Sequence, residues 1–339
     1  MNAVAETQRT LHRSHKVVSK LPKIASSRRL ELAAQADSDP YELNHLIPEI
    51  NDIEVRNGIS KAPVGNSLRV TAWNLRRGRH WKQTAEIFRR TPLRGTDVLL
   101  ATEMDLGMAR SGNQHIAREL ALELGMNYAY GVEFLELTKG EPEERDCPGE
   151  NAWGYHGNAI LSRYPLESVS MLRFPGIERW FRDDQQRLGG RIALFAKIAV
   201  GGRSLLLASV HLETGKNAVT IRKRQAQLLI ENIGDYSPVV LGGDFNATPD
   251  EPAIRHMRIA NFLVEECNQL SIPTREPLNS SQSGGHIDYV FARGLYPVHD
   301  ISSPVVVGST DRLTTGDIRV SDHAAVTVVL RWFYDESRH

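Results

Sequence analysis

The sequence is poor in cysteine, has no long apolar run and carries no excess of charge of either sign. Its two cysteines, Cys147 and Cys267, lie far apart and lack the spacing of a metal site. This usage fits a reducing compartment and argues against a disulfide framework, with a single bridge as the open alternative, so we expect a cytoplasmic protein. Lys plus Arg and Asp plus Glu each number 41, so no global positive field attracts nucleic acid, although a local basic groove stays open.

The sequence also lacks the signals of a membrane or repeat protein. No apolar stretch approaches the ~20 residues that span a bilayer, and the N-terminus has no apolar signal core. We find no repeat of fixed period, and nothing points to an obligate protein partner. The 339 residues fit one large α/β domain or two smaller ones.

The first 66 residues differ in composition from the rest of the chain. Basic residues dominate the first thirty and acidic residues the stretch that follows, and short helices are expected near 30–36 and 41–50. We interpret residues 1–66 as an N-terminal extension, partly disordered or with short helices, and residues 67–335 as the main domain. A transit peptide and a contact with an anionic surface are the alternatives for the basic part.

The main domain alternates apolar strand patterns with helical ones, which predicts an α/β fold. Two long loops interrupt it. Residues 138–154 are rich in acidic residues, as in a functional lid or a disordered segment. Residues 175–190 carry Trp180, Phe181 and Arg187, which we expect to be exposed. The two aromatic residues would then either insert into a lipid surface or, more ordinarily, anchor their loop.

The most informative stretch runs from Val239 to Pro249. A buried strand pattern breaks at two glycines and then presents Asp244 and Asn246. Residues two apart in an extended segment point to the same side, so a carboxylate and a carboxamide emerge together. The same residue types also form turns, and this stretch alone does not decide between a site and a turn.

Similar polar residues end the other apolar strands. They are Asn74, Glu103, His211, Asp288, Asp322 and His323. Strand ends converge on one edge of a layered sheet protein, where clefts form. Each residue alone is ordinarily a turn or a helix cap, but the repeated use of metal-ligand and acid/base types favours a site. Oxygen ligands favour Mg²⁺ or Mn²⁺ and suit metal-assisted phosphate ester hydrolysis.

The motifs in their order resemble one family. They are Thr71-Ala-Trp-Asn74, Leu100-Ala-Thr-Glu103, Gly157-Asn-Ala-Ile-Leu-Ser-Arg163, Ser209-Val-His211, Gly242-Gly-Asp-Phe-Asn246, Ile287-Asp288 and Ser321-Asp-His323. The set is similar to the endonuclease/exonuclease/phosphatase superfamily and spans roughly residues 67–332. The resemblance implies a four-layer α/β sandwich of two mixed β-sheets flanked by helices, as in DNase I.

The resemblance also implies a metal site. It makes Glu103 the main ligand of a Mg²⁺ ion, for which Mn²⁺ can substitute, with Asn74 and Asp322 beside it.

It further implies the catalytic groups. Asp244 would activate water and Asn246 would hold the phosphate. Asp288 would orient His323, which would contact the phosphate. His211 matches the histidine of the DNase I and sphingomyelinase branches, and this argues against an abasic-site enzyme.

The substrate is less defined than the chemistry. The stretch from Glu103 to Asn113 resembles a bacterial subgroup of the superfamily. Arg110, His156, Asn158 and Arg191 are our candidates for substrate binding, although each also fits an ordinary structural role.

We therefore expect a Mg²⁺-dependent phosphoesterase, more specifically a phosphodiesterase. A nuclease is the leading version, against which stand the neutral charge and the acidic loop. A phospholipid or another small phosphodiester is the alternative substrate. A non-catalytic binding protein on this fold is the remote alternative.

Overall fold

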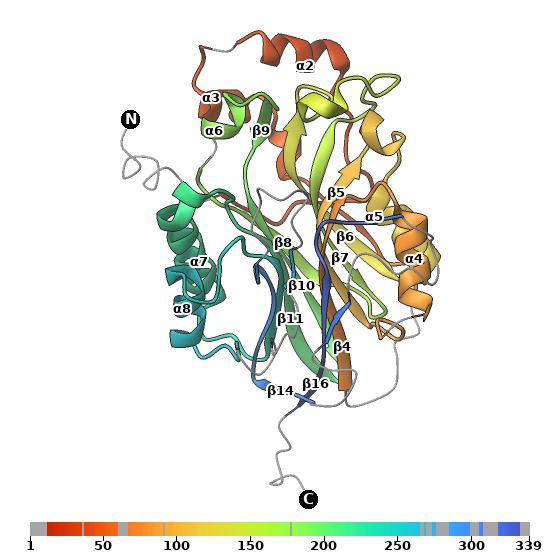
Figure 1. The fold of residues 1–339 in the computed structure, drawn as a ribbon, viewed down its shortest axis with the longest axis vertical. Coiled ribbons are helices and arrows are strands. Elements are labelled where there is room, and N and C mark those ends of the chain that lie inside the picture. The colour runs from red at the N-terminus through yellow and green to blue at the C-terminus, as the bar shows by residue number, and fades with distance from the viewer. Residues whose placement is uncertain are drawn as a thin grey trace, which may run out of the picture.

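The computed structural model describes residues 12–35, 37–59, 67–90, 92–176, 178–264, 268, 273–275, 285–298, 305–307 and 318–332. Two mixed β-sheets lie face to face, with helices on their outer faces (Figure 1). Among the described residues, the smaller sheet has the strand order β1-β8-β10-β11-β12-β13. The larger sheet has the order β14-β16-β4-β5-β7-β6-β3-β2, with β15 beside β16 and β9 beside β6. The α/β fold class is confirmed.

The strands are β1 (His12–Ser14), β2 (Val17–Val18), β3 (Ile53–Arg56), β4 (Ser67–Arg77), β5 (Val98–Leu106), β6 (Asn127–Glu136), β7 (Tyr155–Ser162), β8 (Glu167–Arg173), β9 (Arg187–Gly189), β10 (Ile192–Val200), β11 (Arg203–His211), β12 (Val239–Asp244), β13 (Asp288–Arg293), β14 (Leu295–Pro297), β15 (Val305–Val307) and β16 (Ala325–Trp332).

The α-helices are α2 (Ser26–Ala33), α3 (Pro40–His45), α4 (Trp81–Arg90), α5 (Ile116–Leu124), α6 (Glu178–Phe181), α7 (Val219–Ile233) and α8 (Pro252–Ile259). Short 3₁₀ turns are η1 (Pro48–Asn51), η2 (Ala109–Ser111), η3 (Pro142–Glu144) and η4 (Lys216–Ala218). None of the described helices combines the length and the apolar composition needed to cross a bilayer.

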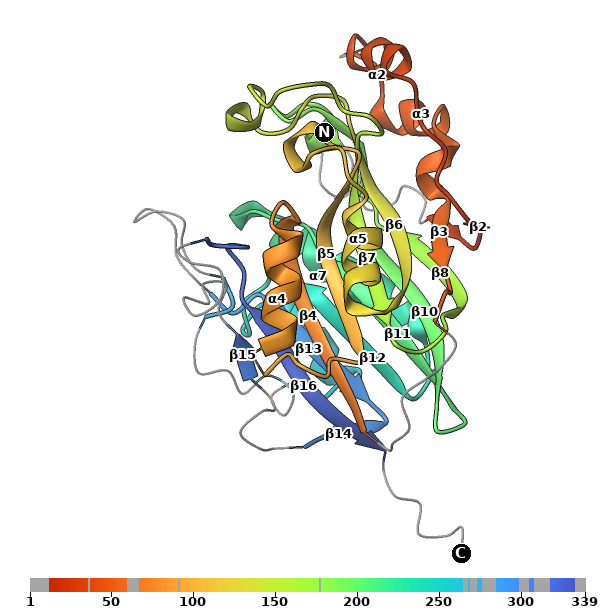
Figure 2. The same cartoon turned by 90° about the vertical axis from the view of Figure 1, so that its right-hand side faces the viewer.

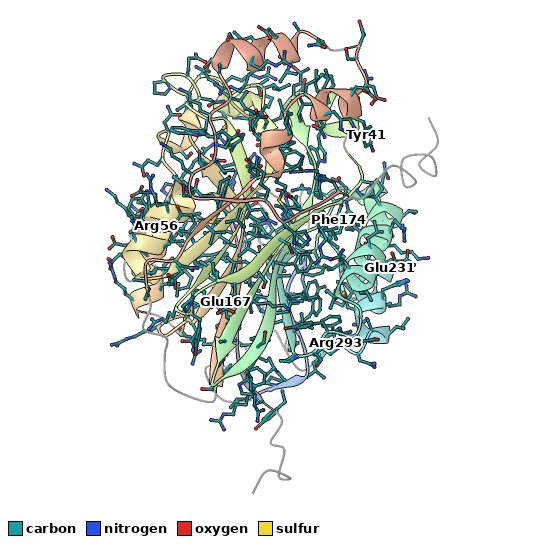
Figure 3. The ribbon with its side chains drawn as sticks, turned by 180° about the vertical axis from the view of Figure 1, so that it is seen from behind. Tyr41, Arg56, Glu167, Phe174, Glu231 and Arg293 are labelled. Carbon is teal, nitrogen blue, oxygen red and sulfur yellow. The ribbon has the colours of Figure 1, made fainter. Side chains whose placement is uncertain are left out.

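Three apolar cores hold four layers together. Apolar residues on the inner faces of both sheets form the central core. A second core joins α4 and α5 to the outer face of the larger sheet, as Figure 2 shows. The third joins α7 and α8 to the smaller sheet. Figure 3 shows that side from behind, where Phe174 is buried in this core and Glu231 is exposed on α7.

Irregular strand pairing changes the direction in which two site residues of the larger sheet point. We expected Asn74 and Glu103 at strand ends, but β4 and β5 continue beyond them. The register of β4 with β5 shifts after Asn74, and that of β5 with β7 shifts around Glu103. Glu103 has a φ of 56°, a left-handed conformation that costs a residue with a Cβ about 1–3 kcal/mol. These β-bulges re-aim the side chains toward the sheet edge.

The described part of the N-terminal segment is built into both sheets. β1 pairs with β8 of the smaller sheet, and β3 pairs with β6 of the larger one. Leu21, Leu32 and Leu43 are buried in the same core as α4 and α5. The buried guanidinium of Arg29 donates hydrogen bonds to main-chain oxygens, including that of Trp153. The division of the chain at residue 66 stays a prediction.

The expected exposure of Trp180, Phe181 and Arg187 in the 175–190 loop is wrong. Trp180, Phe181 and Arg187 are only 4%, 2% and 6% exposed. The guanidinium carbon of Arg187 lies 4.1 Å from the ring centre of Trp180 and 4.4 Å from that of Phe134. The guanidinium of Arg187 packs against both rings, which explains why Arg187 and Trp180 are buried. The aromatic pair therefore anchors its loop instead of reaching a lipid surface.

Leu32→Ala is expected to lower the free energy of unfolding by about 2–5 kcal/mol, because it removes a buried leucine side chain. Leu32 is 0% exposed, whereas Leu30 of the same helix is 68% exposed. Leu30→Ala is the matched control and is expected to change stability by at most about 0.5 kcal/mol. Urea unfolding followed by circular dichroism measures both. Equal midpoints for Leu32→Ala and the wild type would show that the N-terminal segment is no part of the cooperative core.

Candidate active site

A polar cavity of about 470 Å³ lies where the strand ends and bulges of both sheets meet. Its described lining contains the side chains of Glu103, His211, Asp244, Asn246 and His323. Pro142 and Trp180 are the apolar members of that lining. A cavity of this size suits a small polar ligand or one group of a larger one.

Strand register aligns three of the predicted residues. In the smaller sheet His211 pairs with Asp244, and Asp244 pairs with Asp288, across β11, β12 and β13. Gly243 has a φ of 138°, and a Cβ there would collide with the carbonyl oxygen of Val210. The glycine before Asp244 therefore allows β12 to pass close to β11.

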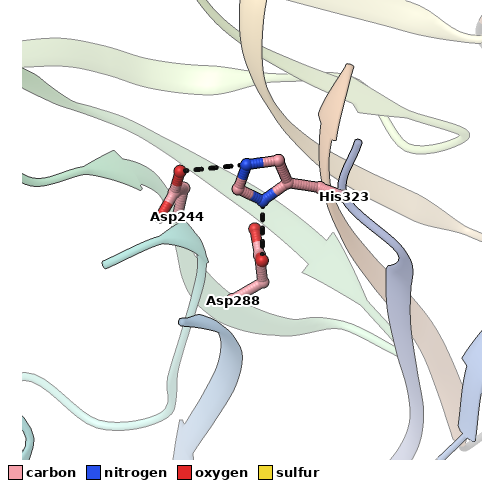
Figure 4. Close-up of side chains that lie close together, drawn as sticks. All are labelled: Asp244, Asp288 and His323. Atoms are coloured by element: carbon pink, nitrogen blue, oxygen red, sulfur yellow. Dashed lines mark hydrogen bonds and ion pairs between the residues drawn. The ribbon is translucent and has the colours of Figure 1, made fainter. Parts of the chain in front are cut away.

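Asp244 lies between two histidines. Its Oδ2 is 3.6 Å from Nε2 of His211 and 3.8 Å from Nε2 of His323. Figure 4 shows the second of these contacts, with His323 placed between Asp244 and Asp288. The other oxygen, Oδ1, accepts a 2.8 Å hydrogen bond from the main-chain N–H of Asn246.

His323 and Asp288 form a buried ion pair. Nδ1 of His323 is 2.8 Å from Oδ2 of Asp288. Burial raises the pKa of Asp288 to about 6, although the charge of His323 opposes this shift. Burial alone would lower the pKa of His323, but the carboxylates of Asp288 and Asp244 raise it to about 10. Between these values the pair is imidazolium and carboxylate.

A second carboxylate holds the other histidine. Oε2 of Glu133, on β6, is 3.2 Å from Nδ1 of His211, and Oε1 accepts a 3.2 Å hydrogen bond from Nη1 of Arg191. Burial would raise the pKa of Glu133, but the charges of His211 and Arg191 lower it to about 2. Each histidine thus has one nitrogen on a carboxylate and the other facing Asp244.

Asn74 connects the two sheets at the centre of the site. Its Nδ2 donates to Oε1 of Glu103 at 3.1 Å and to Oδ2 of Asp244 at 3.0 Å. The other oxygen of Glu103, Oε2, accepts a 3.2 Å hydrogen bond from Nη1 of Arg77. Burial would raise the pKa of Glu103, but Arg77 and nearby histidines hold it well below its usual range.

The remaining metal candidate, Asp322, also lines the cavity. Its Oδ1 is 3.7 Å from Nε of Arg76. Asn246, which has a left-handed φ of 49°, donates from Nδ2 to the carbonyl oxygen of Leu212.

The four candidates for substrate binding separate into different environments. Arg191 contacts His211, and His156 lines the cavity. Arg110 is buried behind it and donates twice to Asp105 at 2.9 Å, and Asp105 also bonds Nδ1 of His156 at 2.8 Å. Asn158 is buried in β7, where its Nδ2 donates to a main-chain oxygen, and it is not part of the described lining.

Sequence reasoning missed Glu133, Arg77 and Asp105. Glu133 and Asp105 are 0% exposed carboxylates within otherwise apolar strands. A charge in such a position requires a buried partner. A carboxylate inside an apolar strand pattern was therefore the signal in the sequence that could have revealed both residues. Arg77 follows Asn74 closely, but its direction depends on the bulge in β4.

Two groups of described side chains could hold a hard divalent cation. Glu103, Asp244 and Asp322 present carboxylate oxygens to the cavity, and the side chain of Glu103 is 20% exposed there. Asp244, Asp288 and His323 also have ligand atoms within 4.8 Å of one another. In that group, however, the imidazole already bonds Asp288.

Asp288→Asn is expected to lower the pKa of His323 by at least about one unit, because an opposite charge at this distance shifts a pKa by 1–3 units. His323 has a raised pKa, so its contribution to stability is present below its ordinary value and is lost as pH rises through about 10. An NMR titration of the metal-free protein, with His323→Gln to assign the signal, measures the shift. Glu133→Gln, in the other pair, is the control. An unchanged pKa in Asp288→Asn would contradict the ion pair.

Comparison with known proteins identifies the family of this chain. The sequence model of the Endonuclease/Exonuclease/phosphatase family matches residues 71–323. A putative neutral sphingomyelinase of Drosophila melanogaster is 24% identical over 203 residues, or 54% of this chain and 46% of the relative. The matched region thus spans about half the length of that curated relative.

Solved structures share the fold. An endonuclease/exonuclease/phosphatase from Beutenbergia cavernae DSM 12333 is 20% identical, with a TM-score of 0.58 over 79% of this chain and 72% of that one. The catalytic domain of human Nocturnin is 18% identical, with a TM-score of 0.53 over 80% and 96% of the two chains. The family match covers most of the chain and includes all the site residues from Asn74 to His323. The chain therefore belongs to the endonuclease/exonuclease/phosphatase family, whose members are hydrolases of phosphate esters.

Proposed function

We propose that this chain hydrolyses a phosphodiester with the help of Mg²⁺, for which Mn²⁺ can substitute. The observation that carries the proposal is the position of Asp244. It lies between two histidines, each backed by a buried carboxylate, and shares the amide of Asn74 with Glu103. General acid/base groups and a carboxylate suited to a cation therefore face one cavity.

Asp244 is the base in this proposal. Its Oδ2 faces both imidazoles, and a water molecule in the cavity can approach it. The amide of Asn246 holds Oδ1, which fixes the carboxylate plane. In this proposal water attacks the phosphorus directly, without a covalent enzyme intermediate.

The two histidines bind the phosphoryl oxygens. Asp288 keeps Nδ1 of His323 occupied, so that Nε2 is directed toward Asp244 and the substrate. Glu133 does the same for His211. Donors positioned in advance stabilise the negative charge that develops in the transition state.

Glu103 is the principal ligand of the cation, with Asp322 and Asn74 beside it. A divalent cation bound there would polarise the phosphoryl group and stabilise the leaving oxygen. Asn74 holds Oε1 of Glu103 beside Asp244, which sets the distance between cation and base.

The charge of the cavity favours a small phosphodiester over nucleic acid. Seven carboxylate residues face five arginines and the imidazolium of His323 on its described surface, whereas a groove for a polyanion needs a positive excess. Glu144 of the acidic loop turns inward to arginines, so part of that loop's charge is neutralised. A phospholipid diester is the second candidate, supported by the likeness to a putative neutral sphingomyelinase.

Hydrolysis of a substrate panel tests the proposal. The panel contains a generic phosphodiester, a phosphomonoester, plasmid DNA, RNA and sphingomyelin, each with Mg²⁺ and with EDTA. We expect Mg²⁺-dependent cleavage of the generic phosphodiester that exceeds cleavage of DNA. Loss of one donor that stabilises the charge of the transition state ordinarily costs about 10²–10³-fold in rate, and His211→Ala is expected to show a loss of this size.

His256→Ala is the matched control for that variant. His256 lies on α8, is half-buried and bonds Gln227 and the carbonyl oxygen of Pro252. We expect it to retain wild-type activity. Cleavage that survives EDTA, or that is equal in His211→Ala and the wild type, would contradict the proposed site.

A further inference from the structure

One buried arginine contacts both the proposed cation ligand and the acidic loop. Nη1 of Arg77 donates to Oε2 of Glu103 at 3.2 Å, and Nη2 donates to Oε1 of Glu141 at 3.1 Å. Its Nε lies 3.5 Å from Oε1 of Glu144. Arg77 is 7% exposed, so three carboxylates from two parts of the chain share one guanidinium.

The backbone is strained where it places this side chain. Arg76 and Arg77 have φ values of 42° and 71°, in the left-handed region that residues with a Cβ avoid. The pairing of β4 with β5 is interrupted between Asn74 and Arg77. Two such residues in succession are costly and persist only where surrounding contacts determine them. The direction of Arg77 is therefore a feature that the fold enforces.

The loop from Thr138 to Gly154 is organised around Glu144. Oε2 of Glu144 accepts from Nη1 of Arg110 and from the main-chain N–H of Glu141, both at 2.9 Å. Arg79 also pairs with Glu144. Arg79 has no contact with Glu103 among the described pairs, so Arg77 is the arginine that joins this loop directly to Glu103.

We infer that Arg77 is a positioning residue that couples the loop Thr138–Gly154 to the cation site at Glu103. This inference rests on the proposed function, because it takes Glu103 as the cation ligand. A cation at Glu103 competes with Arg77 for Oε2 and repels its charge. The guanidinium then turns fully to Glu141 and Glu144, which tightens the loop over the cavity. By reciprocity, the docked loop favours the cation.

Two measurements on the full chain separate the roles of Arg77. Calorimetry with Mg²⁺, checked by Mn²⁺ paramagnetic resonance, gives the cation affinity. Hydrogen exchange of peptides from residues 138–150 gives the stability of the loop, where the amides of Glu144 and Cys147 bond within the loop. Mg²⁺ is expected to slow this exchange about fivefold or more in the wild type, a coupling at the low end of the usual range.

Arg77→Met is expected to bind Mg²⁺ about tenfold more tightly, since a repelling and competing charge is removed. The amide hydrogens of its loop exchange faster than those of the wild type, and Mg²⁺ no longer slows their exchange. Arg77→Lys retains the charge, so its cation affinity returns toward the wild-type value. One ammonium group cannot bridge three carboxylates, so the amide hydrogens of the loop still exchange faster than in the wild type.

Arg79→Met is the matched control, with faster loop exchange and a cation affinity no higher than that of the wild type. Glu141→Gln, at an exposed carboxylate, weakens the coupling without disturbing the buried network. A wild-type chain that binds no divalent cation would overturn the proposed cation site and this inference with it. A chain that binds the cation while Arg77→Met keeps the wild-type affinity and loop response would overturn the inference alone.

Discussion

The side-chain amide of Asn74 is the contact on which the arrangement of the site depends. It donates to Glu103 in the larger sheet and to Asp244 in the smaller one, and thereby sets the spacing of two carboxylates that would otherwise repel each other. The site is therefore a product of sheet packing, because neither sheet alone contains both the proposed cation ligand and the proposed base. The bulges in β4 and β5 are the local condition for this contact.

Around this contact the buried carboxylates have partners. Glu133 bonds Arg191 and contacts Nδ1 of His211, and Asp288 pairs with His323. A buried charge without a partner would cost several kcal/mol, which is about the whole stability margin of many domains. The same pairing that makes these groups tolerable inside the protein also orients them for chemistry. Stability and function depend here on the same hydrogen bonds.

Much of the site was predictable from short motifs, because strand register converts sequence order into a row of side chains. His211, Asp244 and Asp288 are such a row. Glu103 was expected at a strand end but lies on a bulge, which depends on pairing with two neighbouring strands and leaves no local pattern. Glu133 was missed because its partner His211 is 78 residues away. The burial of Trp180 was missed for a similar reason, since Phe134 and Arg187 cover it only in the folded chain.

The central claim concerns where the cation and the phosphate bind. Anomalous diffraction from crystals soaked with Mn²⁺ and inorganic phosphate tests it most directly. Our account predicts a Mn²⁺ peak at the Glu103 carboxylate and a phosphate ion within hydrogen-bond distance of Nε2 of His211 and of His323. A Mn²⁺ peak enclosed by Asp244, Asp288 and His323, with none at Glu103, would contradict it.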